Sequence, residues 1–175
     1  MSADDTVAVV RSAVLSPDGA YRYELRREWG PEPLCGWVML NPSTADALVD
    51  DPTIRRCMGF ARAWGAGGIV VTNLFALRAT DPAELARHPA PRGPASEAAW
   101  RRLVEGAVTV VCAWGAHPMA AQVAPELLAV FDARGVTPQC LGATRSGAPR
   151  HPLYVRGHTP LRAFRVGAGC SGGVR

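Results

Sequence analysis

The chain has 175 residues, of which 48% are hydrophobic, and this length suits one compact domain with a core of ordinary size. The formal net charge is +4 and the sequence has arginine but no lysine, so a polyanionic partner is allowed but not required. No apolar run approaches the roughly 18 residues of a membrane span and the acidic N-terminus lacks a signal-peptide pattern, so we expect a cytoplasmic protein with no membrane partner.

Two β-like runs open the chain over residues 7–29, and the segment SPDG at 16–19 between them has the composition of a turn. An antiparallel hairpin is therefore predicted. The later apolar runs lack period-two alternation, which is typical of strands covered on both faces. Cys35, Cys112 and Cys140 lie in these runs and are predicted to be reduced core residues. The four runs occupy residues 35–40, 68–75, 107–114 and 136–142.

Helical patterns separate these runs. Asp51 is the expected N-cap of the first helix, with Pro52 at its first position and Gly65 at its end. Asp81 and Glu84 predict a capping box at the start of a second helix. Two further helices are predicted at about 95–105 and at about 123–133.

The alternation of strands and helices favours an α/β sandwich with a mainly parallel central sheet and an N-terminal β-hairpin. We expect a single α/β domain over residues 7–165 and a flexible tail over 166–175.

Polar residues follow each of the four apolar runs. Because the carboxyl ends of parallel strands meet at one edge of a sheet, these residues are predicted to converge on one cleft. The cleft would hold two amides, a histidine, hydroxyls and arginines. The predicted cleft residues are Asn41, Pro42, Ser43, Thr44, Asn73, Phe75, Arg78, Trp114, Thr144, Arg145, Arg150 and His151.

Asn41 precedes Pro42, which forces an extended backbone that should present the amide outward. A turn role and a site role are equally open for Asn41, and the same placement of Asn73 favours a site. An amide cannot act as a general base, but it can orient a water or read the edge of a planar heterocycle. His151 suits donation to an anionic leaving group, or else a turn, and Phe75 could stack on a base.

Three aspartates follow the polar segment Asn41–Thr44 in the sequence. Helix capping explains Asp51, whereas Asp46 and Asp50 could hold a ribose, a water or a cation. No pair of histidines has metal-ligand spacing, so no metal and no other cofactor is expected.

The chain resembles a family of small uncharacterised bacterial and phage proteins, known as a domain of unknown function, over nearly residues 12–160. The resemblance rests on YRYELRREW, VMLNPSTADALVDDPTIRRC, GIVVTNLFALRATDPAEL, AWG and CLGATRSGAPRHPLYV. More distantly, the order strand-Asn-Pro, strand-Asn, strand-Gly and His-Pro is similar to that of the uracil-DNA glycosylase superfamily. That likeness implies a three-layer α/β/α sandwich and a reaction that needs no metal.

The second resemblance also implies roles for three residues. Asn41 matches the amide that positions the attacking water in the mismatch-specific branch, and Asn73 matches the amide that reads the flipped base. His151 matches the start of the late His-Pro-Ser-Pro segment and would stabilise the departing base anion. The chain departs from this pattern with Leu-Tyr in place of Ser-Pro, which removes backbone that grips phosphate.

The resulting hypothesis is a nucleobase N-glycosidase-like protein that acts on DNA, a nucleotide or a nucleoside. Its partner would be a nucleobase-containing small molecule or a nucleic acid, with phosphate held by Arg78, Arg145 and Arg150. One alternative is a non-catalytic nucleotide-binding or nucleic-acid-binding module. The other is a small-molecule hydrolase or transferase that uses Asp46 or Asp50 with His151.

Overall fold

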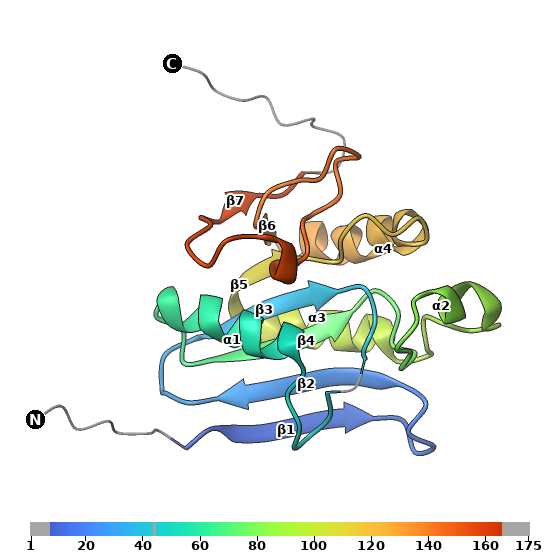
Figure 1. The fold of residues 1–175 in the computed structure, drawn as a ribbon, viewed down its shortest axis with the longest axis horizontal. Coiled ribbons are helices and arrows are strands. Elements are labelled where there is room, and N and C mark those ends of the chain that lie inside the picture. Colours follow the sequence, from blue (N-terminus) through green and yellow to red (C-terminus); the bar gives the residue numbers. More distant parts are fainter. Residues whose placement is uncertain (1–7, 44, 166–175) are drawn as a thin grey trace, which may run out of the picture.

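The computed structural model describes residues 8–43 and 45–165 of the chain. In this part of the chain the strands form one seven-stranded sheet in the order β1-β2-β4-β3-β5-β6-β7 (Figure 1). The strands are β1 (Val10–Leu15), β2 (Arg22–Glu28), β3 (Leu34–Met39), β4 (Gly68–Asn73), β5 (Ala107–Cys112), β6 (Gln139–Cys140) and β7 (Arg162–Ala163).

The predicted N-terminal hairpin is confirmed. Strands β1 and β2 pair antiparallel, and the backbone N–H of Gly19 donates to the carbonyl oxygen of Ser16 at 2.9 Å in the turn between them. Strand β2 also pairs antiparallel with β4, so the hairpin extends the main sheet at one edge. The start of β2 therefore lies at the same end of the sheet as the carboxyl end of β4.

The prediction of a mainly parallel sheet was wrong, because the described sheet is mixed. Strands β3, β4, β5 and β6 run parallel to one another, which gives three parallel pairs. The hairpin contributes two antiparallel pairs, and β7, which the sequence analysis did not predict, adds a third on β6. The parallel strands are nevertheless those that carry the predicted cleft residues.

The four predicted helices are all present. The Asp51 carboxylate accepts the Ile54 N–H at 2.8 Å and so caps the first helix, which ends before Gly65, where φ is 76°. The predicted capping box forms in part: the Asp81 N–H donates to the Glu84 carboxylate at 3.4 Å, but the Asp81 carboxylate accepts the N–H of Ala83 at 2.9 Å and not that of Glu84. The helices are α1 (Pro52–Ala63), α2 (Ala83–Arg87), α3 (Ser96–Gly106) and α4 (Ala120–Ala133), followed by the 3-10 turn η1 (Pro152–Tyr154).

Two boundaries differ from the sequence analysis. Helix α4 begins at Ala120, three residues before the expected start at 123, and contains Pro125 near its N-terminal end. Strand β6 comprises two residues of the predicted run 136–142. The predicted tail at 166–175 lies outside the described residues.

Helices cover both faces of the sheet. Alternate residues of the central strands enter two different hydrophobic clusters, so that Trp37 packs with Ile54 and Phe60 of α1, while Val38 packs with Trp100 of α3. Figure 1 shows α1 on one side of the strands and α3 and α4 on the other. The buried residues include three cysteines that the sequence analysis placed in the core, namely Cys35, Cys112 and Cys140.

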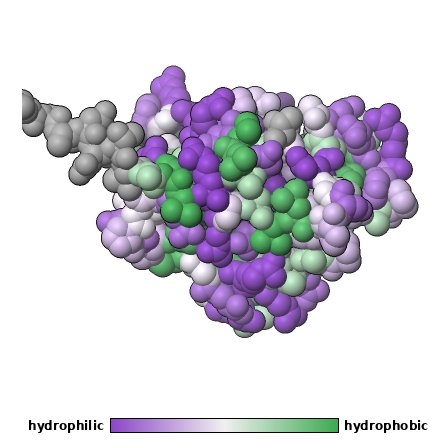
Figure 2. Space-filling model, turned by 90° about the horizontal axis from the view of Figure 1, so that it is seen from below, coloured by the Kyte–Doolittle hydropathy of each residue, from purple (hydrophilic) through white to green (hydrophobic). Residues whose placement is uncertain are grey.

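The outer surface beyond β1 mixes hydrophobic patches with hydrophilic residues (Figure 2). In β1 and the loop that follows β3, Val10, Val14, Leu48 and Val49 are exposed hydrophobic residues. Among the described residues, no helix has the length and hydropathy needed to cross a membrane.

Candidate functional site

A cleft of about 250 Å³ lies at the carboxyl ends of β3, β4 and β5, beside the first turn of α1 and the turn η1. It brings together residues that are far apart in the sequence, as expected for polar residues that follow parallel strands. The predicted site residues that line it are Asn41, Ser43, Asn73, Trp114 and His151.

Asn41 follows β3 and is fixed by two backbone carbonyl groups. Its Nδ2 donates to the carbonyl oxygens of Pro42 at 2.9 Å and Ala79 at 2.8 Å. Because both acceptors are carbonyls, the side-chain nitrogen must face them, and the amide cannot be turned over. The remaining polar atom, Oδ1, is an acceptor, and it can receive a hydrogen bond from a water or a ligand in the cleft.

Asn73 ends β4 and pairs with Met39 of β3. The residue is 3% exposed, and neither Nδ2 nor Oδ1 of its side chain has a hydrogen-bond partner among the described residues. Leaving a buried polar group unpaired costs about 1–3 kcal/mol, so native proteins avoid it outside functional sites. Asn73 thus presents an unused donor and an unused acceptor, side by side, to the cleft that it lines.

His151 is the N-cap of η1. Its Nδ1 accepts the backbone N–H of Leu153 at 3.3 Å, which assigns the proton of the neutral imidazole to Nε2. Burial lowers the pKa of His151 from its ordinary value, and the nearby Asp51 carboxylate opposes this shift. The imidazole is therefore neutral near pH 7 and offers Nε2–H as a donor.

Arg56 of α1 holds the segment that carries His151. Its Nε donates to the carbonyl oxygen of Pro152 at 3.3 Å and its Nη2 to that of Val155 at 2.5 Å. The Arg56 guanidinium also stacks on the Phe60 ring, 5.1 Å from the ring centroid. Helix α1 thereby connects the loop that follows β3, through Asp51, with the segment that carries His151, through Arg56.

Arg22 is a cleft residue that the sequence analysis missed. Val14 of β1 pairs with Glu24 and Leu15 pairs with Arg22, so Tyr23 is an extra residue in β2. Such a bulge reverses the alternation of side chains between the two faces of the strand. Arg22 therefore lies on the face opposite to Glu24 and lines the cleft. Strict alternation in YRYELRREW would place both residues on one face, and nothing in this run indicates a bulge.

Arg22 carries a positive charge into the cleft. The residue is 3% exposed, and burial lowers its pKa to about 10, so the guanidinium stays protonated near neutral pH. Its Nη1 donates to the carbonyl oxygen of Ala45, and its Nε has no hydrogen-bond partner among the described residues. The cleft therefore holds a buried cation beside the unpaired amide of Asn73.

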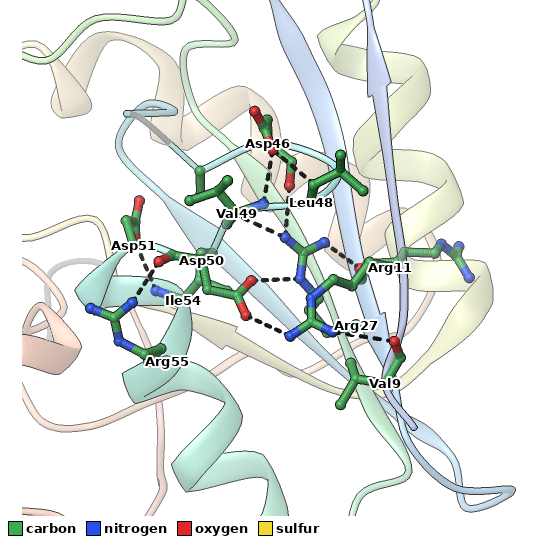
Figure 3. Close-up of polar contacts among 12 residues, drawn as sticks. Val9, Arg11, Arg27, Asp46, Leu48, Val49, Asp50, Asp51, Ile54 and Arg55 are labelled. Carbon is green, nitrogen blue, oxygen red and sulfur yellow. Dashed lines mark hydrogen bonds and ion pairs between the residues drawn. The ribbon is translucent and has the colours of Figure 1, made fainter. Parts of the chain in front are cut away.

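Asp50 lies outside the cleft and forms an ion pair with β2 (Figure 3). Its Oδ1 accepts the Nε–H of Arg27 at 2.6 Å, and its Oδ2 accepts from Arg11 at 3.2 Å. The Arg27 side chain is fully buried. Both carboxylate oxygens of Asp50 are thus committed to arginines that attach the loop to the hairpin, and the expected catalytic role has no support in this geometry.

Asp46 also lies outside the cleft. Its Oδ1 accepts the backbone N–H groups of Leu48 at 2.8 Å and Val49 at 2.9 Å, and these bonds lower its pKa (Figure 3). This is the geometry of an Asx turn. Asp51, by contrast, caps α1 and also lines the cleft. Thr53 and Tyr154 line the cleft too, and none of these three residues was predicted as a site residue.

The other predicted residues are spread around the cleft. Phe75 is 2% exposed in the hydrophobic core, and Arg78 donates to the carbonyl oxygen of Gly19 at 3.4 Å. Thr144 accepts the Ala148 N–H in a turn, and Arg150 is exposed.

Pro42 is buried, and its carbonyl oxygen anchors Asn41. Arg145 lines a second cavity of about 630 Å³, of which Trp114 is also a wall. Thr44 lies outside the described residues. Within the described parts of the chain, no group of three or more His, Cys, Asp or Glu side chains is arranged to hold a metal ion.

A family model described as "Protein of unknown function (DUF1643)" matches residues 22–153, a region that contains the cleft residues from Arg22 to His151. No curated protein and no solved structure matches the chain.

Proposed function

The chain belongs to the DUF1643 family of proteins of unknown function, and we propose that it is a nucleobase N-glycosidase-like protein acting on DNA, a nucleotide or a nucleoside. The proposal includes a likeness to the three-layer fold of the uracil-DNA glycosylases. The observation that carries it is the buried and unpaired amide of Asn73 at the carboxyl edge of the sheet.

An unpaired amide suits a nucleobase because it offers a donor and an acceptor in one plane. A base presents a carbonyl oxygen next to a ring N–H or an amino group along its edge, which complements the two atoms of Asn73. The cleft volume of about 250 Å³ is below the roughly 300–1,000 Å³ of pockets for drug-sized ligands, so it suits a single ring system.

Hydrolysis would break the bond between C1′ of the sugar and a ring nitrogen of the base. The electron pair of that bond goes to the base, a water oxygen bonds to C1′, and the water loses a proton. Asn41 Oδ1 accepts from the water and orients it. The Nε2–H of His151 and the Nδ2–H of Asn73 donate to the base as negative charge develops on it.

Asp51 is the carboxylate among the residues that line the cleft. One of its oxygens caps α1, which leaves the other to take the proton of the water or to stabilise the cationic sugar. Asp46 and Asp50, which lie outside the cleft, do not support a hydrolase that uses either of them with His151.

The test is release of free base from oligonucleotides, nucleotides and nucleosides that contain uracil or modified bases, measured by chromatography. We expect release by the wild type and its loss in Asn41→Ala. Gln122→Ala is the matched control, because it removes an exposed amide of α4 that does not line the cleft. Release that survives Asn41→Ala, or no release from any substrate, would reject the enzymatic proposal.

A second candidate is a binding module without turnover. It is favoured by Asn41, whose amide cannot take a proton from water as a carboxylate can. Binding of a nucleobase ligand that is lost in Asn73→Ala, without release of base by the wild type, would select this candidate.

A further inference from the structure

Arg22 and Arg27 are both buried arginines of β2, and their surroundings differ sharply. Arg27 is 0% exposed and donates from Nε to Asp50, from Nη1 to the carbonyl oxygen of Arg26, and from Nη2 to that of Asp46 (Figure 3). All three nitrogens of Arg27 are thus used. This is how the chain satisfies a guanidinium that only holds structure together.

Arg22 has far fewer partners. Its Nη1 reaches the carbonyl oxygen of Ala45, its Nε is unpaired, and no carboxylate of the described residues forms an ion pair with it. The Asp51 and Asp46 carboxylates influence Arg22 through their charge alone. A buried cation without a paired anion is costly, so its retention at the wall of a cleft indicates an anion that comes from outside.

The neighbouring acids make their hydrogen bonds with other groups of the described residues. Asp50 bonds to Arg27 and Arg11, and the Asp46 carboxylate takes two backbone N–H groups. Asp51 accepts from the first turn of α1, where the positive end of the helix dipole also offsets its charge. Among the described residues, none of these three acids is hydrogen-bonded to Arg22, and Asp51 and Asp46 act on it only through their charge.

The position of Arg22 links it to Asn73. The backbone N–H of Arg22 donates to the carbonyl oxygen of Ala76 at 2.9 Å, just beyond the end of β4 where Asn73 lies. Both side chains line the same cleft. A ligand that pairs its ring edge with Asn73 can thus place an oxyanion on Arg22.

We propose that Arg22 binds an oxyanion of the ligand, so that the substrate class of this cleft is a nucleobase compound with a carboxylate or phosphate, and not a neutral base or nucleoside. The inference rests on the proposed function for the nucleobase part of the ligand. The oxyanion part rests on Arg22 and its missing counter-ion.

The test compares two pairs of probes by isothermal titration calorimetry. The affinity for orotate is compared with that for uracil, which tests the effect of a carboxylate on the ring. The affinity for uridine 5′-monophosphate is compared with that for uridine, which tests the effect of a phosphate on the sugar. Charge-assisted bonds to guanidinium are strong, so we expect the wild type to bind one anionic probe at least about tenfold more tightly than its neutral counterpart. The pair that shows the preference identifies the source of the oxyanion.

In Arg22→Gln the preference should fall to about twofold or less. Arg26→Gln is the matched control, because it removes a half-buried arginine of the same strand that does not line the cleft, and it should retain the preference. Circular dichroism checks the fold of each variant. If Arg22→Gln does not fold, Arg22→Lys keeps the charge without the paired geometry, and the preference should fall to an intermediate value.

Equal binding of charged and neutral probes by the wild type overturns the inference, as does a lack of binding to both anionic probes or a preference that persists in a folded Arg22→Gln protein. These outcomes are independent of base release. If the wild type prefers anionic probes through Arg22 but releases no base, the inference about the oxyanion holds and the proposed glycosidase activity is rejected. If it releases base from neutral nucleosides and shows no preference for anionic probes, the glycosidase activity holds and the inference about the oxyanion is rejected.

Discussion

The indole N–H of Trp100 donates to the backbone carbonyl oxygen of Asn73 at 2.9 Å, while the side-chain amide of Asn73 has no partner among the described residues. Helix α3 therefore fixes the backbone at the end of β4 from one face of the sheet. The side-chain amide of Asn73 lines the cleft. The bond from Trp100 thus fixes the backbone of Asn73, while its amide remains available to a ligand.

Asn73→Ala should separate stability from binding. The change removes two buried polar atoms that have no partner, so we expect the free energy of unfolding to stay the same or to rise by up to about 1 kcal/mol. Binding of the nucleobase ligand should be lost. Urea denaturation and calorimetry measure the two effects, and a loss of more than about 1 kcal/mol would mean that the amide has a structural partner.

Asn41→Ala should behave differently. Its Nδ2 donates to the carbonyl oxygens of Pro42 and Ala79, so the substitution removes one donor from each. The Pro42 oxygen keeps its bond from the Ala79 N–H at 3.0 Å, so the cost falls mainly on the Ala79 carbonyl. We expect a loss of about 1–2 kcal/mol in the free energy of unfolding, measured by the same denaturation. A variant as stable as the wild type would show that this bridge between the two loops contributes little.

Asp50→Asn tests whether this aspartate is structural or catalytic. The change leaves the fully buried Arg27 guanidinium without its anion, and we expect a loss of about 3 kcal/mol in the free energy of unfolding. Asp46→Asn is the control, since asparagine keeps the acceptor of this solvent-accessible Asx turn and should cost less stability than Asp50→Asn. An Asp50→Asn protein that keeps full stability and loses activity would restore the catalytic role predicted from the sequence.

The stability of the protein should depend on the protonation of His151. Burial lowers the folded-state pKa below the unfolded value of 6.5, so the unfolded chain binds more protons between these two values. The free energy of unfolding should therefore fall as the pH falls from 6.5 toward the lower, folded-state pKa, and this contribution should be constant above 6.5.

Urea denaturation at pH 7.5 and at pH values below 6.5 measures this dependence. His151→Asn retains an acceptor for the Leu153 N–H but has no group that titrates in this range. The dependence in this window should be smaller in the variant. An equal slope in both proteins would assign it to other groups.

Arg56→Met should loosen the segment that carries His151. The variant loses the bonds to the carbonyl oxygens of Pro152 and Val155, so we expect faster amide hydrogen exchange over residues 151–157 and weaker ligand binding. Arg62→Met is the control, because Arg62 lies on the same helix and stacks on Trp29, 4.6 Å from the ring centroid. Equal exchange in both variants would show that α1 does not hold this segment through Arg56.

Much of the fold follows from local patterns in the sequence. The hairpin turn, the Asp51 cap and the bond from Asp81 to Glu84 join residues that are close in the chain, so short motifs predict them. The mixed sheet was not predicted, because the pairing of β2 with β4 joins residues that are 40 or more positions apart and leaves no local pattern. The length of β6 likewise depends on its neighbours.

The sequence by itself determined where polar side chains leave the strands. Asn41, Asn73 and Trp114 meet at one cleft because each ends or closely follows a parallel strand at the same edge, and His151 joins them from the start of η1. Their order and spacing are properties of the chain, and the geometry of a parallel sheet brings them together.

Only the tertiary structure decided how these groups are partnered. The bulge at Tyr23 places Arg22 at the cleft. Asp50 forms an ion pair with the buried Arg27 and so lies outside the cleft. Whether a buried polar atom is paired depends on segments that pack against it from elsewhere in the chain, and burial makes each missing partner costly. Among the described residues, the unpaired amide of Asn73 and the unpaired Nε of Arg22 are therefore evident only in the folded chain.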